Sequence, residues 1–258
     1  MKTNLPVVFA NWKMNKTLAE TRDYFNRLVT PAKAFAGRAE IFVLVPHTAL
    51  SLAAGLTAGS GIHVGSQNHF WEDSGPHTGE ISAAMVRDCG GRYALIGHEE
   101  RRFHFGESLV DMRRKARSAL HHRLTPILCV GESTRDRRTG GTESVLTYQV
   151  EFVFQGFTPS EVARCYVLYE PAWAIGAEEP VSPTAAREAH EWIRHAVGRL
   201  FGNQAAETIR ILYGGSVRPE NVSEFLLRKG VDGVGVGRSG LEPETFLEII
   251  EAAASLYP

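Results

Sequence analysis

The hydrophobic positions of this chain fall into short and long segments that alternate from one end to the other. Eight short runs rich in β-branched and aromatic residues have the length of buried strands, and a longer stretch with helical spacing follows each of them. Strands are expected at Val7–Ala10, Ile41–Val45, Ile62–Gly65, Tyr93–Ile96, Pro126–Val130, Cys165–Tyr169, Ile209–Tyr213 and Gly233–Val236. Helices are expected at Thr17–Val29, Ala49–Ala58, Ile81–Cys89, Ser108–His122, Gly141–Phe154, Pro183–Phe201, Pro219–Arg228 and Pro243–Ser255.

This alternation is typical of an α/β protein whose parallel strands are joined by helical crossovers. The eight units fill 258 residues with no linker or low-complexity segment between them. A closed (β/α)8 barrel takes about 250 residues and leaves no sheet edge, whereas the alternative, an open doubly wound sheet, leaves its edges exposed. The sequence therefore predicts a single-domain (β/α)8 barrel over residues 1–258.

Local signals mark several helix starts and the loops before them. Thr17 and Glu20 have the spacing of a capping box, and Pro183, Pro219 and Pro243 are expected in first helical turns. In a barrel the strand-to-helix loops gather at the face that carries the active site. These loops hold most of the polar and glycine residues: Asn11–Lys16, Gln67–Glu80, Gly97–Gly106, Glu170–Ser182, Gly214–Arg218 and Gly237–Glu242.

Composition narrows the possible partners and compartment. Hydrophobic residues make up 43% and charged residues 22% of the chain, as in ordinary globular proteins. The net charge is −1 and no tract is strongly basic, so neither nucleic acid nor a membrane surface is an expected partner. Three cysteines without a CxxC pair, and no apparent secretory signal, favour a reducing cytoplasm.

One uncharged stretch, Ile41–Trp71, could be mistaken for a membrane span. Pro46, His47 and Ser51 interrupt it where a spanning helix should be most uniformly apolar. A buried strand followed by a helix explains this stretch better, so no membrane segment is expected.

Two motifs suggest cofactor or metal binding, and neither has the context it needs. Gly235–Gly240 matches G-x-G-x-x-G, but the 18 residues after it cannot supply the next strand and its ribose-binding acid. His190 and His195 are five residues apart, which separates them by about 140° around a helix, so they cannot share a metal ion. The sequence predicts no cofactor and no metal.

Three predicted strands end in residues suited to proton transfer. Lys13 follows the first strand, His98 ends the fourth and Glu170 ends the sixth. A carboxylate can remove a proton next to a carbonyl while a neutral imidazole and an ammonium stabilise the resulting enediolate. The glycine-rich loops after strands seven and eight offer backbone N–H groups to a phosphate.

Four motifs in register carry a resemblance to a known family. They are Asn11-Trp-Lys-Met-Asn15, Gly97-His-x-Glu-Arg-Arg102, Tyr169-Glu-Pro-x-Trp-Ala-Ile-Gly176 and Tyr213-Gly-Gly-Ser-Val217. In this order and spacing the chain closely resembles the triosephosphate isomerase family over nearly its whole length. The resemblance implies a TIM barrel that interconverts dihydroxyacetone phosphate and glyceraldehyde 3-phosphate without a cofactor.

The resemblance also implies residue roles. Glu170 would be the base, His98 the neutral electrophile and Lys13 the electrostatic clamp. Asn11 would orient the sugar phosphate, and Glu100 would hold Lys13. The N–H groups binding phosphate would come from Gly176, Ser216, Gly237 and Arg238, and a lid over the substrate would begin at Pro171–Gly176.

Three departures from the family pattern matter. Glu99 replaces the usual serine, and at about 4 Å from Glu170 it would repel that carboxylate by up to about 4 kcal/mol. We therefore expect Glu99 to turn away, toward Arg101 or Arg102. The second departure is the lid tip, which reads Ala177-Glu-Glu-Pro180. The third is Arg238, which replaces a glycine. The Arg238 side chain either adds to the phosphate clamp or points outward.

These departures keep other functions open. Arginine after that glycine also occurs in a branch of the family that isomerises L-erythrulose 1-phosphate, a four-carbon ketose phosphate, in erythritol catabolism. A Schiff-base aldolase using Lys13 or Lys229 and a non-catalytic sugar-phosphate-binding barrel are the alternatives from other classes.

The loop Gln67–Glu80 is long for a compact domain, and such loops are usually functional or disordered. In the family it reaches into a second subunit, where Thr78 approaches the partner's active site. The resemblance therefore implies a homodimer formed through this loop.

Overall fold

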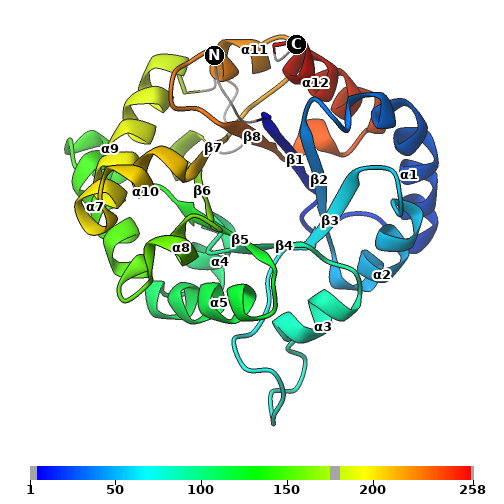
Figure 1. Ribbon diagram of the computed structural model, residues 1–258, viewed down its shortest axis with the longest axis horizontal. Coiled ribbons are helices and arrows are strands. Elements are labelled where there is room, and N and C mark those ends of the chain that lie inside the picture. Colours follow the sequence, from blue (N-terminus) through cyan, green and yellow to red (C-terminus); the bar gives the residue numbers. More distant parts are fainter. Residues whose placement is uncertain (1–4, 175–180, 257–258) are drawn as a thin grey trace.

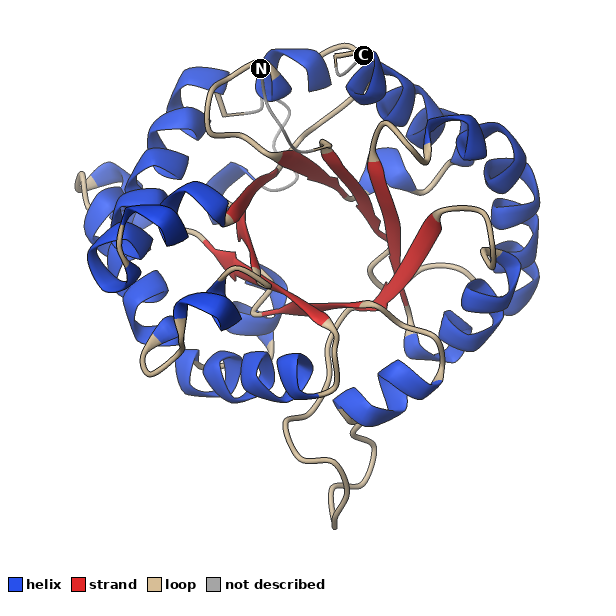
Figure 2. Ribbon diagram, in the orientation of Figure 1, coloured by secondary structure: helices blue, strands red, loops and turns tan. Residues whose placement is uncertain are grey.

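Eight parallel strands, hydrogen-bonded in sequence order, close into a barrel when β8 (Gly233–Val236) pairs with β1 (Val7–Asn11). The computed structural model describes residues 5–174 and 181–256. Figure 2 shows the ring of strands inside a ring of helices. The predicted α/β barrel is confirmed, and the open sheet is excluded.

The remaining strands are β2 (Glu40–Val45), β3 (Ile62–Ser66), β4 (Tyr93–Ile96), β5 (Thr125–Val130), β6 (Tyr166–Tyr169) and β7 (Arg210–Gly214). The helices are α1 (Leu18–Ala32), α2 (His47–Leu56), α3 (Ala83–Asp88), α4 (Glu99–His104), α5 (Leu109–His121), α6 (Thr134–Arg138), α7 (Thr142–Phe154), α8 (Pro159–Val162), α9 (Pro183–Phe201), α10 (Asn203–Thr208), α11 (Val222–Leu226) and α12 (Pro243–Ser255). Short 3-10 helices cover Lys33–Phe35, Ala172–Ala174 and Arg238–Gly240.

Every predicted strand boundary lies within one residue of the observed one, whereas the helices differ more. Thr17 and Glu20 form the expected capping box of α1, and Pro183 and Pro243 begin their helices. Pro219 does not, because the Asn221 side chain accepts a hydrogen bond from the Arg218 N–H and holds a turn there, so α11 starts at Val222. The short helices α6, α8 and α10 were not predicted.

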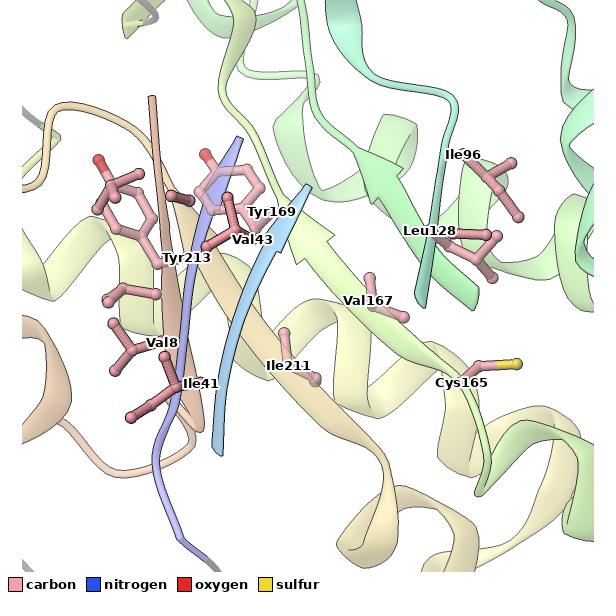
Figure 3. Close-up of a cluster of buried hydrophobic side chains, with 14 of the residues drawn as sticks. Val8, Ile41, Val43, Ile96, Leu128, Cys165, Val167, Tyr169, Ile211 and Tyr213 are labelled. Atoms are coloured by element: carbon pink, nitrogen blue, oxygen red, sulfur yellow. The ribbon is translucent and has the colours of Figure 1, made fainter. Parts of the chain in front are cut away.

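Side chains of the strands alternate between two apolar layers. Val7 and Phe9 point into the barrel, and the Phe42 ring stacks on Phe9 with ring centroids 4.9 Å apart and on Tyr93 at 3.8 Å. The alternate positions, such as Val8, pack outward against the helices (Figure 3). Because both faces are buried, the strands read as continuous apolar runs.

The amino end of the barrel is closed by a polar cluster. Glu40 accepts hydrogen bonds from the hydroxyl groups of Tyr93 at 2.8 Å and Tyr166 at 2.6 Å. The open cavity lies at the opposite, carboxyl end of the strands, where it is lined by residues that follow β1, β4, β6, β7 and β8.

One connection departs from this compact shape. The segment between β3 and α3, which contains residues 67–80, projects well beyond the ring of helices (Figure 1). No helix in the described ranges is long and apolar enough to cross a membrane.

The barrel interior predicts one stability effect. A Cβ atom on Gly235 would lie 2.3 Å from the Phe9 ring, so Gly235→Ala should lower the free energy of unfolding by about 1–3 kcal/mol through overpacking. Gly55, within α2, has nothing within 4 Å of such an atom, and Gly55→Ala should instead stabilise by about 0.5–1 kcal/mol. Urea unfolding of both variants checks this, and equal effects would contradict it.

Candidate active site

Residues from five strand ends line one cavity of about 320 Å³ at the carboxyl end of the barrel. This volume lies near the lower end of the range of small-molecule sites. Of the residues predicted from sequence, those around the cavity are Asn11, Lys13, His98, Glu170, Ser216, Gly237 and Arg238. Glu100 stands behind Lys13, and Gly176 and the lid tip at residues 177–180 lie outside the described residues.

Lys13 is fixed at both its backbone and its side chain. Its backbone has a φ of 54°, in the left-handed region that non-glycine residues rarely adopt. The side-chain oxygen of Asn11 accepts a hydrogen bond from the Lys13 N–H at 3.0 Å, which supports this conformation. The Lys13 ammonium donates to Glu100 Oε1 at 2.7 Å. The positive charge is therefore held at the cavity wall.

His98 is 5% exposed and caps the start of α4. Its Nδ1 accepts a hydrogen bond from the Glu100 N–H at 3.3 Å, and an imidazole that accepts there carries its proton on Nε2. Nε2 lies 3.2 Å from Glu170 Oε1. The ring therefore directs its Nε2 atom toward the cavity and Glu170.

The turn that carries His98 rests on a buried carboxylate. Glu107, whose side chain is 2% exposed, accepts the Gly97 N–H at 3.0 Å and the Arg101 Nε at 2.7 Å. The Lys115 ammonium lies 3.1 Å from the same carboxylate. Two cations and one N–H thus compensate this buried charge, and the backbone just before His98 is held in place.

Glu170 is 4% exposed and sits where β5 and β6 approach each other closely. A Cβ atom on Gly131 would lie 1.8 Å from the Glu170 carbonyl oxygen, so only glycine allows this approach. Burial, and then the nearby Glu170 carboxylate, raises the pKa of the Cys129 thiol, so the thiol stays protonated. The Glu170 side chain is enclosed by the barrel apart from its opening to the cavity.

The expected pairing of Glu99 with Arg101 or Arg102 was wrong. Glu99 makes no ion pair with Arg101 or Arg102 among the described residues, because Arg101 binds Glu107 and the Arg102 Nε donates to the Gly97 carbonyl. The Glu99 N–H lies 3.4 Å from Glu170 Oε2, and its half-buried side chain remains beside the site. Burial first, and then the charge of Glu170, raises the pKa of Glu99, and His98 and Lys13 oppose this shift.

The opposite wall of the cavity carries the glycine-rich loops. Ser216 and Gly237 face the cavity from the ends of β7 and β8, and the Ser239 hydroxyl ties the two loops together by donating to the Val217 carbonyl at 2.8 Å. The exposed Arg238 lines the cavity, and so does Arg218. Two arginine residues therefore contribute to this wall of the cavity.

Donor atoms of His98, Glu99 and Glu100 lie within 4.8 Å of one another, close enough for a cation. The Lys13 ammonium already occupies the Glu100 carboxylate at 2.7 Å, and His98 Nδ1 accepts an N–H. The positive charge beside these residues is therefore the Lys13 ammonium group, which takes the place that a metal ion would need at Glu100.

Sequence reasoning missed several residues that support the site. Arg218 lines the cavity, Gln149 makes hydrogen bonds to both the N–H and the carbonyl of Gly131, and the fully buried Glu132 accepts the Trp173 Nε1–H at 2.8 Å. Gln149 lies 18 residues from Gly131 along the chain, and Glu132 lies 41 residues from Trp173. The local sequence pattern does not predict such contacts. Once the fold shows that a charged residue is buried, a hydrogen-bonding partner for it can be expected.

The fold and the site define a (β/α)8 barrel with an acid–base centre at the carboxyl ends of its strands. The model of the family described as triosephosphate isomerase matches residues 6–253. The chain therefore belongs to the triosephosphate isomerase family, a family of aldose–ketose isomerases.

Individual relatives cover nearly the full length. The chain is 43% identical over 248 residues to the triosephosphate isomerase of Rubrobacter xylanophilus, covering 96% of this chain and 97% of the relative. It is 41% identical over 247 residues to that of Moorella thermoacetica, covering 95% and 97%. A crystal structure of triosephosphate isomerase from Bartonella henselae superposes with a TM-score of 0.83 at 34% identity, covering 96% of this chain and 98% of that one.

The two glutamates beside His98 should affect stability in opposite directions. Glu99 has a raised pKa, so its ionisation destabilises the fold as the pH rises above about 4.3, the ordinary value. Burial acts to raise the pKa of Glu100, but the hydrogen bond from Lys13 outweighs it and holds that pKa below its ordinary value. The ionised Glu100 therefore stabilises the fold above the ordinary pKa of glutamate, and this stabilisation is lost as the pH falls through the lowered pKa.

We therefore expect Glu99→Gln to be more stable than the wild type at pH 7 and Glu100→Gln to be less stable. Both differences should shrink toward pH 3.5, where the wild-type carboxyls are protonated in the unfolded chain. Urea unfolding between pH 3.5 and 8 measures this. A Glu99→Gln variant that loses stability as the pH rises, relative to the wild type, would contradict the burial of that carboxylate.

Proposed function

We propose that this chain catalyses the cofactor-independent interconversion of dihydroxyacetone phosphate and glyceraldehyde 3-phosphate. The observation that carries the proposal is the convergence of Glu170, His98 and Lys13 on one cavity from three separate strand ends. The family membership of the chain supports the same reaction. The residue roles below are part of this proposal.

The base is Glu170, which takes the proton from the substrate carbon next to the carbonyl. Its side chain is enclosed, and an enclosed carboxylate reacts without first losing a shell of water. His98 donates its Nε2–H to the oxygens that become the enediolate, and the Lys13 charge stabilises the same oxygens. Asn11 orients the substrate, and Glu100 keeps Lys13 in place. The proton held by Glu170 then returns to the neighbouring carbon, while His98 transfers the hydroxyl proton from the oxygen that becomes the carbonyl to the other substrate oxygen.

The phosphate is assigned to the opposite wall. The backbone N–H groups of Ser216, Gly237 and Arg238 bind its oxygens, with Gly176 completing the set from outside the described residues. The guanidinium groups of Arg218 and Arg238, both exposed at this wall, add attraction for the dianion. This arrangement places the reacting carbons toward Glu170 and the phosphate away from it.

Two alternative reactions receive less support. A Schiff base requires a neutral amine, whereas the Lys13 ammonium is paired with Glu100 at 2.7 Å, and Lys229 is not among the cavity residues. The four-carbon substrate rests on Arg238 and on the altered lid tip at residues 177–180, which lies outside the described residues, and the relatives reported for this chain are all named for the triose reaction. A non-catalytic barrel has no use for the three converging groups.

We further propose that residues 1–258 act as one catalytic domain in the cytoplasm. The described strands all belong to one barrel. The three cysteines, Cys89, Cys129 and Cys165, are free thiols, as is usual in a reducing compartment.

A homodimer is the proposed assembly. The projecting segment at residues 67–80 has little of its own chain around it in Figure 1, and a loop of this kind gains stability when a second subunit surrounds it. Met14, at the rim of the cavity loop, is 96% exposed, and Met85 in α3 is 49% exposed. Exposed apolar side chains such as these favour a protein interface, and the proposed dimer brings the projecting segment of one subunit to the site of the other.

The test of the catalytic proposal is Glu170→Asp, which draws the carboxylate back by one methylene. We expect kcat to fall by about 10²–10⁴ while substrate binding is retained, because a displaced base loses proton-transfer efficiency. Glu248→Asp, in an exposed position of α12, is the matched control and should turn over normally.

Three results would refute the assignment. They are unchanged turnover by Glu170→Asp, faster turnover of L-erythrulose 1-phosphate than of glyceraldehyde 3-phosphate by the wild type, and borohydride trapping of a substrate adduct.

The dimer is tested by sedimentation of the active enzyme, which should give twice the 28.4 kDa of one chain. Met85→Glu should weaken association by about tenfold or more, since a charge buried at an interface lacks a partner. Leu227 is the C-cap residue of α11 and is 69% exposed. Leu227→Glu is the control and should leave association unchanged. A fully active monomer at micromolar concentration would exclude the dimer.

A further inference from the structure

Three metal-binding side chains meet on the surface, away from the catalytic cavity. Asp73 comes from the projecting segment, His121 is the last residue of α5, and His122 caps that helix. One donor atom from each lies within 4.8 Å of the other two. The group lies beside a surface cleft lined by both Asp73 and His121.

The three donor atoms lie close to the spacing that one bound ion requires. Zn²⁺ binds imidazole nitrogen and carboxylate oxygen at about 2.0–2.2 Å, so its ligands in a tetrahedral site are about 3.4 Å apart. His122 Nε2 is already 2.6 Å from Asp73 Oδ1. The side chains of Asp73 and His121 are exposed, and the rings of His121 and His122 stand at 85° with centroids 4.9 Å apart.

The local charge allows a dication. The group lies at the C-terminal end of the 13-residue helix α5, where the carbonyl groups favour positive charge. The nearby arginines face other partners: Arg114 lies over the Trp71 ring, Arg117 donates to the Gly156 carbonyl and Arg164 to the Leu120 carbonyl. The acidic residues of the same cleft, which balance these charges, are Glu72, Asp73 and Glu161.

We infer that Asp73, His121 and His122 form a binding site for a divalent transition metal ion of the Zn²⁺ type. Two imidazoles and one carboxylate suit Zn²⁺ and Co²⁺, whereas Mg²⁺ and Ca²⁺ prefer sites built from oxygen alone. His122 binds through Nε2 as the neutral form that carries its proton on Nδ1, so the ion replaces the hydrogen bond to Asp73. Water completes the coordination.

The ion fastens the projecting segment to its own barrel. That segment is already anchored near its base, where the Lys115 ammonium donates to Asn68 at 2.7 Å and the His69 Nε2 lies 3.0 Å from the Lys115 carbonyl. A metal bridge at Asp73 adds an anchor further along the segment. The site does not depend on the proposed catalytic activity, because none of its residues lines the catalytic cavity.

Co²⁺ and Zn²⁺ titrations of the purified full-length chain test the site. We expect one Co²⁺ per chain with the visible absorption of four- or five-coordinate cobalt bound to nitrogen and oxygen, displaced by Zn²⁺. Losing a residue that only hydrogen-bonds to a metal ligand weakens metal binding by roughly tenfold or more. His121→Ala and His122→Ala each remove a ligand itself, so each should weaken Co²⁺ binding by at least that factor. His195→Ala, which removes an exposed histidine from α9, should bind like the wild type.

Thermal unfolding gives a second readout that separates loss of the site from loss of the fold. With chelator present, both histidine variants should unfold at the wild-type temperature. With Zn²⁺ present, the wild type and His195→Ala should unfold at a higher temperature, and His121→Ala and His122→Ala should not, because an ion that binds only the folded chain stabilises it. Equal metal binding by the wild type and the His121→Ala variant would overturn the proposal, and so would a cobalt spectrum of a purely octahedral ion.

Discussion

Pairing between the first and the last strand is the constraint on which the rest of this structure depends. In β1 and β8, Val7 pairs with Gly233 and Ala10 with Val236, and this register turns an eight-stranded sheet into a closed ring. Without that contact two rows of backbone N–H and carbonyl groups would be left unpaired. With it, Lys13 and the glycine loop at Gly237 stand beside each other in one cavity although 224 residues separate them along the chain.

Buried charges then hold the turn that carries His98 in place. Glu107 reaches the backbone before His98, and Lys115 links the same carboxylate to Asn68 at the base of the projecting segment. One hydrogen-bonded network therefore connects the active-site turn with the segment assigned to the dimer and to the metal site. Removing either charge would leave the other buried without compensation, which is costly in a region of low dielectric.

The contacts of Glu99 show where reasoning from residues alone fails. Repulsion from Glu170 is real, since it contributes to the raised pKa of Glu99, but the arginines that were expected to relieve it are taken by Glu107 and Gly97. A residue of the same charge one position later, Glu100, faces Lys13 instead. Which neighbour a charge finds depends on competition among all the groups around it, and that competition is settled only after the backbone is placed.

The sequence by itself determined the eight strands, the order of the units and the family motifs, because burial on both faces of a parallel strand and the caps of helices leave local, periodic marks. It also placed Lys13, His98 and Glu170 at strand ends. Only the tertiary structure decided which distant groups meet: Gly131 against the Glu170 backbone, Cys129 against its carboxylate, and Asp73 beside the histidines at the end of α5. These pairs join segments that no local pattern connects, so their geometry exists only once the chain has closed on itself.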